Sequence, residues 1–330
     1  MPPMDRCAPM CYPSGRSQRE ETIQMRFLPC YRHFPGPMRV ALLPLLLAIA
    51  ISAAAQQPSA PPRKVIRDLA EYNAYMTAVN TKDAAARAAS LEAFARQYPH
   101  SVVYTDALEQ EMAAWQEAGD QEKIKEAARK LLAADGGNVR ALAIVVALDR
   151  YSAERGDTSS LDEACLDSTA GMREVPMWQK PEGMSDADFD KLQKQMASIF
   201  NGAEGFCAWE EKNYSQAQDW LSRAFLLDGT DMQDAYQLAV VDLQMKPEDA
   251  DGFWYCARAI QLAKSTNKDD AAGAMTAACR DSYVKYHGGF DGWDALLAAA
   301  ATQDALPPNF AAGIKAAPAK PAATAAPVPK

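Results

Sequence analysis

The chain has 330 residues, 48% of them hydrophobic and 8% aromatic, with 34 basic against 43 acidic side chains and a formal net charge of −9. This composition indicates a soluble, mostly helical protein with one main domain. The acidic balance argues against nucleic acid as a partner, because a phosphate backbone would be repelled.

The first 65 residues are expected to lie outside the fold. Residues 1–37 are rich in Pro, Arg and Cys without periodicity, and we interpret them as a non-native or disordered extension, with Met25 and Met38 as alternative starts. Residues 38–55 combine a basic start, the apolar run VALLPLLLAIAI and a small-residue stretch, which together predict a secretory signal peptide. The run is shorter than the roughly 20 residues that span a bilayer, and an uncleaved membrane anchor is the alternative. Residues 56–65 are a Pro-rich leader that we expect to be disordered.

A signal peptide predicts a periplasmic or secreted protein. Removing residues 1–55 takes away six Arg and three acidic residues and leaves 28 basic and 40 acidic ones, a net charge of −12. We therefore expect a partner that is neutral, basic or cationic, and we expect the membrane to be involved only through an uncleaved signal segment.

Four cysteines remain beyond the signal segment: Cys165, Cys207, Cys256 and Cys279. An even number in an oxidising compartment permits disulfides. However, Cys207 and Cys256 lie on helical faces that require a small buried residue, which favours free packed thiols. The sequence leaves the pairing open.

Residues 66–264 form a succession of amphipathic stretches separated by short turns, with no alternating strand pattern. Five helix pairs are predicted. They are 66–80 with 83–97, 102–117 with 121–134, 139–151 with 161–173, 185–211 with a helix that begins at Tyr214, and 231–244 with 249–264. Residues 265–305 are expected to form C-terminal capping helices, because the outer face of a terminal unit meets water. Residues 306–330 are expected to be a disordered Pro/Ala-rich tail with nothing to bury.

The fourth pair carries a specific pattern. A small residue, Gly205, lies in its first helix, and the second helix has large and small residues at fixed spacings: Tyr214, Ala217, Leu221 and Ala224. Two antiparallel helices approach closely only where small side chains face each other and large ones fill the remaining gaps. These spacings resemble the tetratricopeptide (TPR) repeat of about 34 residues.

The resemblance covers residues 66–264 and implies an all-α, right-handed solenoid of helix pairs with a C-terminal cap. The intervals between the second-helix anchors at positions 87, 124, 164, 217 and 252 are 37, 40, 53 and 35 residues, so the repeat departs from a constant length. In the family the first helix of each pair lines a concave groove that binds protein or peptide. The resemblance places five residues in or next to that groove: Phe206, Trp209, Tyr236, Glu109 and Gln116. The alternative is that Phe206 and Trp209 belong to the core between repeats.

Such a groove would be acidic and aromatic, which suits a peptide with basic and apolar groups through charge and cation–π contacts. We therefore expect a non-enzymatic scaffold of the bacterial cell envelope. Beyond the signal segment, His100 and His287 are the only histidines, and no spacing typical of a catalytic triad, a metal site or a phosphate loop occurs. No metal, cofactor or catalytic residue is predicted.

A second candidate site is the Gly-rich sequence YHGGFDGW, whose members are Tyr286, His287, Phe290 and Trp293. Glycines that admit close backbone approach and aromatics that line a surface could bind a small ligand or a glycan. The alternative is a helix stop followed by a short helix that closes the end of the solenoid. A weaker third possibility is a regulatory subunit of an envelope assembly complex.

Overall fold

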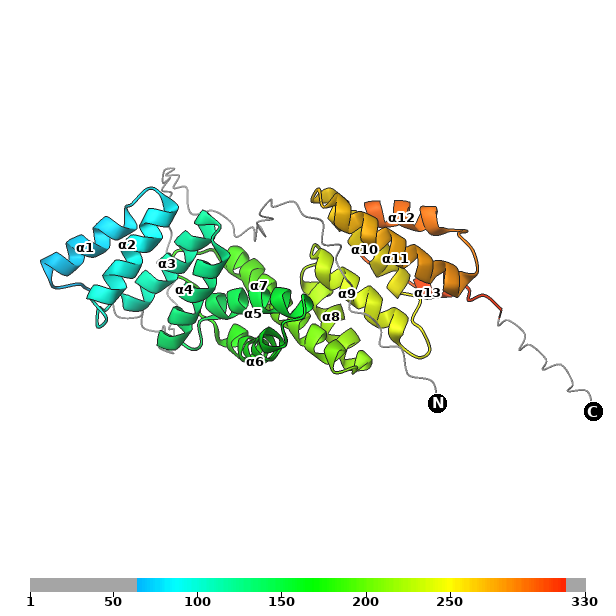
Figure 1. Ribbon diagram of the computed structural model, residues 1–330, viewed down its shortest axis with the longest axis horizontal. Helices are drawn as coiled ribbons and strands as arrows, with labels where there is room; N and C mark the ends of the chain where they lie inside the picture. The colour runs from blue at the N-terminus through cyan, green and yellow to red at the C-terminus, as the bar shows by residue number, and fades with distance from the viewer. Residues whose placement is uncertain (1–63, 319–330) are drawn as a thin grey trace, which may run out of the picture. The chain divides into compact units, whose positions relative to one another are not determined.

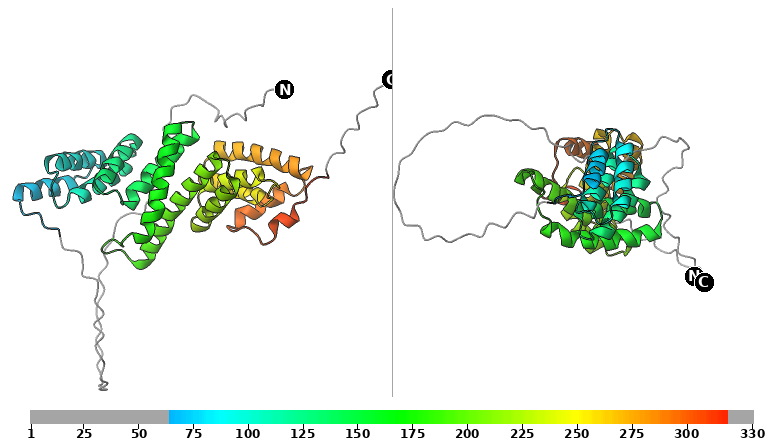
Figure 2. Two further views of the ribbon diagram at one scale, coloured as in Figure 1. Left: turned by 90° about the horizontal axis from the view of Figure 1, so that it is seen from below. Right: turned by 90° about the vertical axis from the view of Figure 1, so that its left-hand side faces the viewer.

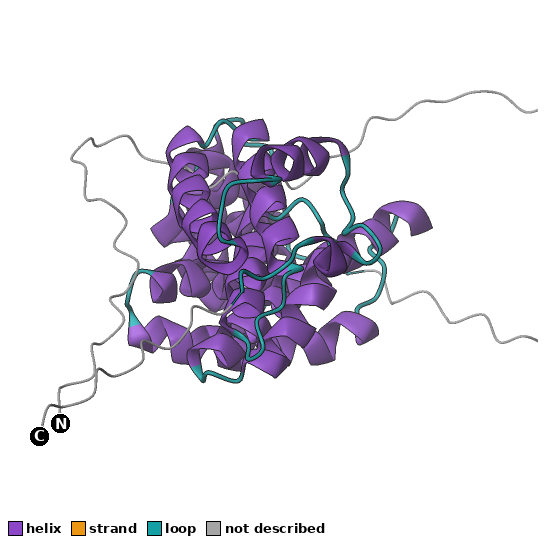
Figure 3. Cartoon of the chain, turned by 90° about the vertical axis from the view of Figure 1, so that its right-hand side faces the viewer, coloured by secondary structure: helices purple, strands orange, loops and turns teal. Residues whose placement is uncertain are grey.

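The computed structural model describes residues 64–318, which form helices joined by turns (Figure 1). Residues 64–318 contain no strand, as Figure 3 shows for the chain coloured by secondary structure. The predicted extension and signal peptide, nearly all of the leader, and residues 319–330 lie outside the described residues. None of the helices within the described range combines the length and the apolar character needed to cross a bilayer.

The described part of the chain has thirteen α-helices and one short 3-10 helix. They are α1 (Leu69–Val79), α2 (Ala84–Gln97), α3 (Tyr104–Ala118), α4 (Gln121–Ala134), α5 (Val139–Glu154), α6 (Thr158–Glu174), η1 (Val175–Met177), α7 (Asp186–Glu210), α8 (Tyr214–Leu227), α9 (Met232–Gln244), α10 (Gly252–Ser265), α11 (Asp269–His287), α12 (Trp293–Thr302) and α13 (Phe310–Gly313).

Helices that follow one another in the sequence pack against one another. They form the adjacent pairs α1/α2, α3/α4, α5/α6, α7/α8 and α9/α10, and the second helix of each pair also packs against the helix that follows it. Figures 1 and 2 show this succession as a continuous change of colour along the described helices. The predicted all-helical class and the five adjacent pairs are therefore confirmed.

Most of the helices begin at a side chain that accepts a backbone hydrogen bond from the first turn. The capping residues are Asp68, Asp83, Asp120, Asn138, Asp157, Ser185, Asn213 and Asp231. Each cap satisfies an amide that has no partner inside the helix, which stabilises a helix start by about 1 kcal/mol. Capping of this kind marks the start of four of the five pairs, whereas Val103, which precedes α3, makes no side-chain cap bond.

Gly205 determines how closely α7 approaches α8. A Cβ atom at this position would lie 2.5 Å from Cγ of the fully buried Leu221, a separation that real Cβ atoms do not show. Any larger residue would push the two helices apart and open the core around Leu221. The small residue that marks the repeat pattern is therefore required by packing.

Two disulfides correct the expectation of free thiols. Cys165 of α6 is bonded to Cys207 of α7, and Cys256 of α10 is bonded to Cys279 of α11. Cys207 and Cys256 are buried, as the sequence pattern required. The expectation failed because the residue opposite each of them on the neighbouring helix is also a cysteine, and a pattern within one helix does not show that. Each disulfide joins the second helix of a pair to the helix that follows.

The predicted boundary of the disordered tail at residue 306 is also wrong. Residues 303–317, which we call the C-terminal strap, pack against the core cluster of α10–α12 through Leu306, Phe310, Ala311 and Ile314. The error arose because Pro and Ala dominate the composition of the tail, whereas a few apolar residues in it suffice to dock. The strap therefore belongs to the folded C-terminal end.

Candidate functional site

Side chains of the first helices bridge from pair to pair and define one surface. Arg140 of α5 donates to Glu109 of α3 over 3.1 Å between Nη1 and Oε1. Trp209 of α7 donates through Nε1 to Oε1 of Gln244 of α9, at 3.0 Å. The first helices also contact one another directly, α5 with α7 and α7 with α9. We call the side on which α3, α5, α7 and α9 meet the first-helix face.

A buried ion pair crosses this face between α5 and α9. Nη1 of Arg150 lies 2.6 Å from Oδ1 of Asp234, 84 positions along the chain, and both residues are buried. The pair passes over Gly202 of α7, where a Cβ atom would lie 2.4 Å from Asp234 Oδ1 and 2.7 Å from Arg150 Nη1. The glycine therefore makes the room in which α5 and α9 are joined across α7.

This ion pair covers a residue that the sequence predicted to lie in an open groove. The Arg150 guanidinium lies over the Phe206 ring at 5.7 Å, and Phe206 is 1% exposed. The placement of Phe206 as a groove residue is therefore wrong, and the alternative of an inter-repeat core residue is right for it. Glu154 extends the cover, since it accepts from Arg150 Nε and from the Gln233 amide.

The Arg150–Asp234 pair is also electrostatically unusual. Burial raises the pKa of Asp234 to about 7, with Arg150 opposing the rise and the nearby Asp231 adding to it. Burial by itself would lower the pKa of Arg150, but the surrounding carboxylates outweigh it and keep Arg150 charged. A second nitrogen of that guanidinium, Nη2, is buried without a hydrogen-bond partner in the described part of the chain.

The other predicted groove residues are partly accessible. Trp209 and Tyr236 are half-buried, and Trp209 is held by Gln244. Glu109 and Gln116 lie on the accessible side of α3, with Glu109 paired to Arg140.

The first-helix face therefore keeps two groups of partly accessible residues, one at α3–α5 and one at α7–α9, while the Arg150–Asp234 pair is buried. The sequence did not single out Tyr151, which belongs to the first group. It is 37% exposed, and the Arg155 guanidinium lies 5.4 Å from the centre of its ring.

The predicted ligand loop does not assemble into one site. Trp293 is 3% exposed and packs on the Tyr283 ring at 5.4 Å, so it belongs to the core. Tyr286 and His287 contact the C-terminal strap, whereas Phe290 is 57% exposed with Arg280 over its ring at 4.2 Å. The four residues thus lie in three different environments: the core, the contact with the strap, and solvent.

Two buried carboxylates at matching repeat positions were missed by the sequence reading. Asp149 and Asp242 each lie 25 positions after a second-helix anchor, Ile124 and Ala217 respectively, and are 0% and 1% exposed. Asp149 is paired with two cations of α4, Lys125 and Arg129, the latter at 2.9 Å. The spacing itself could have revealed this equivalence.

Asp242 has no cation in the corresponding place. Gln218 occupies the position equivalent to Lys125, and its amide donates to Asp242 at 2.8 Å and to Asp249 at 3.2 Å. Burial raises the pKa of Asp242 to about 8, and the nearby Asp249 and Asp251 add to the rise. The carboxyl group is therefore largely protonated at neutral pH.

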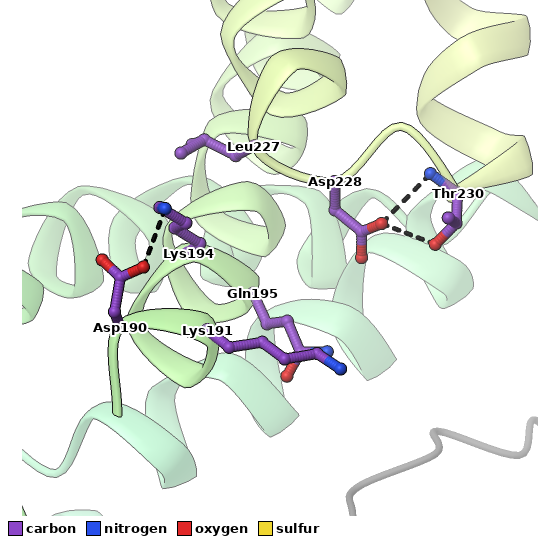
Figure 4. A pocket seen from close by; sticks show the side chains of 7 residues that line it. All are labelled: Asp190, Lys191, Lys194, Gln195, Leu227, Asp228 and Thr230. Atoms are coloured by element: carbon purple, nitrogen blue, oxygen red, sulfur yellow. Dashed lines mark hydrogen bonds and ion pairs between the residues drawn. The ribbon is translucent and has the colours of Figure 1, made fainter. Parts of the chain in front are cut away.

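Two hollows of the described surface lie away from the predicted residues. One of about 390 Å³ lies between the start of α7 and the end of α8, where Figure 4 shows Asp190 paired with Lys194 and Asp228 bonded to Thr230. Another of about 430 Å³ lies beside Arg258 and Gln261 of α10. Charged and polar side chains dominate both. Residues 64–318 contain no group of three or more His, Cys, Asp or Glu placed to hold a metal ion.

Comparison with known proteins gives no relative: no family model, no curated protein and no solved structure matches this chain.

Proposed function

We propose that the chain is a TPR-like, non-enzymatic scaffold of the bacterial cell envelope that binds a protein or peptide along its first-helix face. The observation that carries the proposal is the set of bridges between first helices, α3 to α5, α5 to α9 and α7 to α9. These bridges join separate helix pairs into one surface. Repeat proteins use such composite surfaces to bind extended partners, because each unit adds a few contacts.

The two groups of partly accessible residues on the first-helix face are the proposed contact regions. The first contains Glu109, Gln116 and Tyr151, and the second Trp209 and Tyr236. Each combines aromatic surface with polar groups, which suits a partner that carries basic and apolar side chains. The net negative charge of the chain supports the same choice of partner.

The proposed location in the envelope rests on the signal-peptide pattern and on the disulfides. Disulfides persist in the periplasm and outside the cell and are rare in the cytosol. Two of them within the described residues, Cys165–Cys207 and Cys256–Cys279, support an oxidising compartment.

A pull-down that compares wild-type and variant baits tests the proposal. The chain from residue 56, in wild-type form and as Tyr151→Ala and Trp209→Ala, is used as bait in envelope extract, and captured proteins are quantified by mass spectrometry. The captured amount of one partner should fall at least fivefold with either substitution, because each removes an aromatic contact worth about 1 kcal/mol or more.

The matched control is Leu226→Ala, which removes an 86% exposed apolar side chain from the second helix α8. Circular dichroism verifies that each variant is folded. Capture that is unchanged by both aromatic substitutions, or lost equally with the control, would require the proposal to be abandoned.

A further inference from the structure

The C-terminal strap lies on a defined surface of α10 and α11, which we call the strap surface. Three residues of this surface, Asp251, Tyr286 and His287, bond to the main chain of the strap. Asp251 Oδ1 accepts from the Ala311 amide at 3.0 Å, and the Tyr286 carbonyl accepts from the Ala317 amide at 2.7 Å. The His287 imidazole lies with Nδ1 2.8 Å from the carbonyl oxygen of Lys315 and is the donor there. Contacts of this kind recognise an extended backbone and leave its side chains free.

Side-chain recognition of the strap consists of a few apolar contacts and one ion pair, in which Arg258 of α10 donates to Asp304. Phe310 meets the ring of Trp254 edge-on, with centroids 5.7 Å apart, and Ile314 packs on the same cluster four residues later. Phe310 and Ile314 remain partly exposed. The strap is thus held by a short pattern, an aromatic and then an aliphatic residue, followed by extended main chain.

The strap does not provide a hydrogen-bond partner for every buried polar group of the strap surface. The indole nitrogen of Trp254, Nε1, is buried and has no acceptor within the described residues, although Phe310 packs on the same ring. A buried donor without an acceptor is costly, because its hydrogen bond to water has been lost and not replaced. The strap therefore does not satisfy every polar group of the residues that it contacts.

Release of the strap need not disturb the helices beneath it. The helix before it, α12, has bonds of its own to α10, since Arg258 donates to the Ala300 carbonyl at 3.1 Å and Gln261 donates to the Leu297 carbonyl at 2.9 Å. Arg258 also donates to Asp304 of the strap. The strap begins after α12, and Pro307 and Pro308 precede its apolar residues. It can leave as a terminal segment while α10, α11 and α12 stay packed.

We propose that the strap surface is a peptide-binding site that the chain occupies with its own strap. The partner is a peptide that places an aromatic residue and, four positions later, an aliphatic residue across one helical turn, as α13 does, and continues with small residues whose main-chain groups are free. The tethered strap competes with that partner. This site lies apart from the first-helix face and does not depend on the function proposed above.

The test uses a fluorescent peptide with the sequence of residues 303–318 and the chain from residue 56. In wild type the tethered strap, present at a millimolar effective concentration, should block the peptide. The double substitution Phe310→Ser with Ile314→Ser removes the strap's apolar contacts, and anisotropy should then show binding at least tenfold tighter than to wild type. Adding His287→Ala should weaken that binding about fivefold, the value of one hydrogen bond.

A gentler variant guards against loss of fold. Ala317→Pro removes only the amide that bonds to Tyr286, and peptide affinity should rise about threefold above wild type. Leu226→Ser, which likewise replaces an apolar side chain by serine but on α8, should leave the peptide affinity at the wild-type value. Tyr151→Ala and Trp209→Ala should also leave it unchanged, which separates this site from the first-helix face.

Three results would overturn the proposal. Equal affinity for wild type and the strap variants would show that the strap does not compete. Absence of binding to a Phe310→Ser, Ile314→Ser chain with native near-ultraviolet circular dichroism would show that the surface does not bind peptides. A wild-type dimer that the peptide converts to monomer would show that the occupant is the strap of a second copy.

Discussion

At the scale of single residues, Asp149 and Asp242 show how one repeat position can have opposite electrostatics. Both are buried carboxylates at the same distance from a second-helix anchor, and burial raises the pKa of both. Lys125 and Arg129 limit the rise for Asp149, whereas Asp242 faces Gln218, Asp249 and Asp251. The cations beside Asp149 thus oppose the rise of its pKa, whereas the carboxylates beside Asp242 add to the rise there.

The two positions should therefore respond in opposite ways to the same substitution. The folded-state pKa of Asp242, about 8, lies above its unfolded value of about 4. The folded state binds the proton more tightly, so its stability is greatest at low pH, falls as pH rises between these two values, and is level above them. Asp242→Asn stays neutral and should be more stable than wild type at pH 9, by on the order of 2 kcal/mol.

Asp149→Asn removes the negative charge with which Lys125 and Arg129 pair, although Arg129 keeps Glu163 and Asp167, and should lose about 2 kcal/mol at pH 7. Urea unfolding at pH 5, 7 and 9 checks both variants. Equal pH slopes for wild type and Asp242→Asn would show that Asp242 does not titrate in this range.

Residue patterns predicted the helix pairs well and the site poorly, for a physical reason. Gly205 and Leu221 are 16 positions apart in one pair, and their contact follows from spacing alone. The cover over Phe206 depends on Arg150, which is 84 positions from its partner Asp234. Neither local pattern predicts the contact between Arg150 and Asp234. A residue expected in an open groove therefore proved to be covered.

At the scale of elements, the disulfides fasten each of two helix junctions. Cys165–Cys207 closes a separation of 42 residues and Cys256–Cys279 one of 23. By the chain-entropy relation each contributes roughly 3 to 4 kcal/mol, since the unfolded chain loses freedom. The junctions α6–α7 and α10–α11 are therefore held more firmly than packing alone would hold them.

The two disulfides should differ in their access to reductant. Cys165 is partly exposed, whereas Cys256 and Cys279 are each 2% exposed. In native buffer with dithiothreitol, Cys165–Cys207 should be reduced first, because thiolate attack needs access to a sulfur atom. Alkylation followed by peptide mass spectrometry would follow both bonds, and simultaneous reduction in native buffer would contradict the expectation. In urea the two should be reduced at similar rates.

Helix starts were predicted closely at some capped positions, as at Asp231, but the starts expected at residues 66 and 161 lie three residues from those of α1 and α6, although Asp68 and Asp157 cap these helices. The second helix of the fifth pair was expected from residue 249 and begins at Gly252, for which Asp251 makes no side-chain cap bond. The strap was missed because composition was taken as the guide to disorder. Few apolar residues are needed to order a segment once a surface with free hydrogen-bonding groups lies beside it.

At the scale of the whole described unit, packing between sequence neighbours predicts uneven stability. The first helix, α1, packs mainly on α2 and leaves Leu69 and Tyr72 71% and 47% exposed, whereas α5 is buried along most of its length. Structures that depend on nearest-neighbour interfaces open locally from the ends.

Hydrogen exchange measured by mass spectrometry should find the weakest protection in α1 and α2 and the strongest in α5, α7 and α10. Reducing agent should lower the protection of α6–α7 and α10–α11 and leave α3–α4 as it was. Uniform protection from α1 to α11 would show that the described helices open as a single cooperative unit.

The order of the disulfides along the row of helices has a mechanical consequence. If the chain were stretched from its two ends, the pairs would come apart one after another, and each would lengthen the molecule by the residues it releases. The segments enclosed by Cys165–Cys207 and Cys256–Cys279 cannot be drawn out while those bonds remain. Oxidised protein would therefore reach a shorter contour length than reduced protein. Much of its resistance to stretching would lie in the middle of the row of helices.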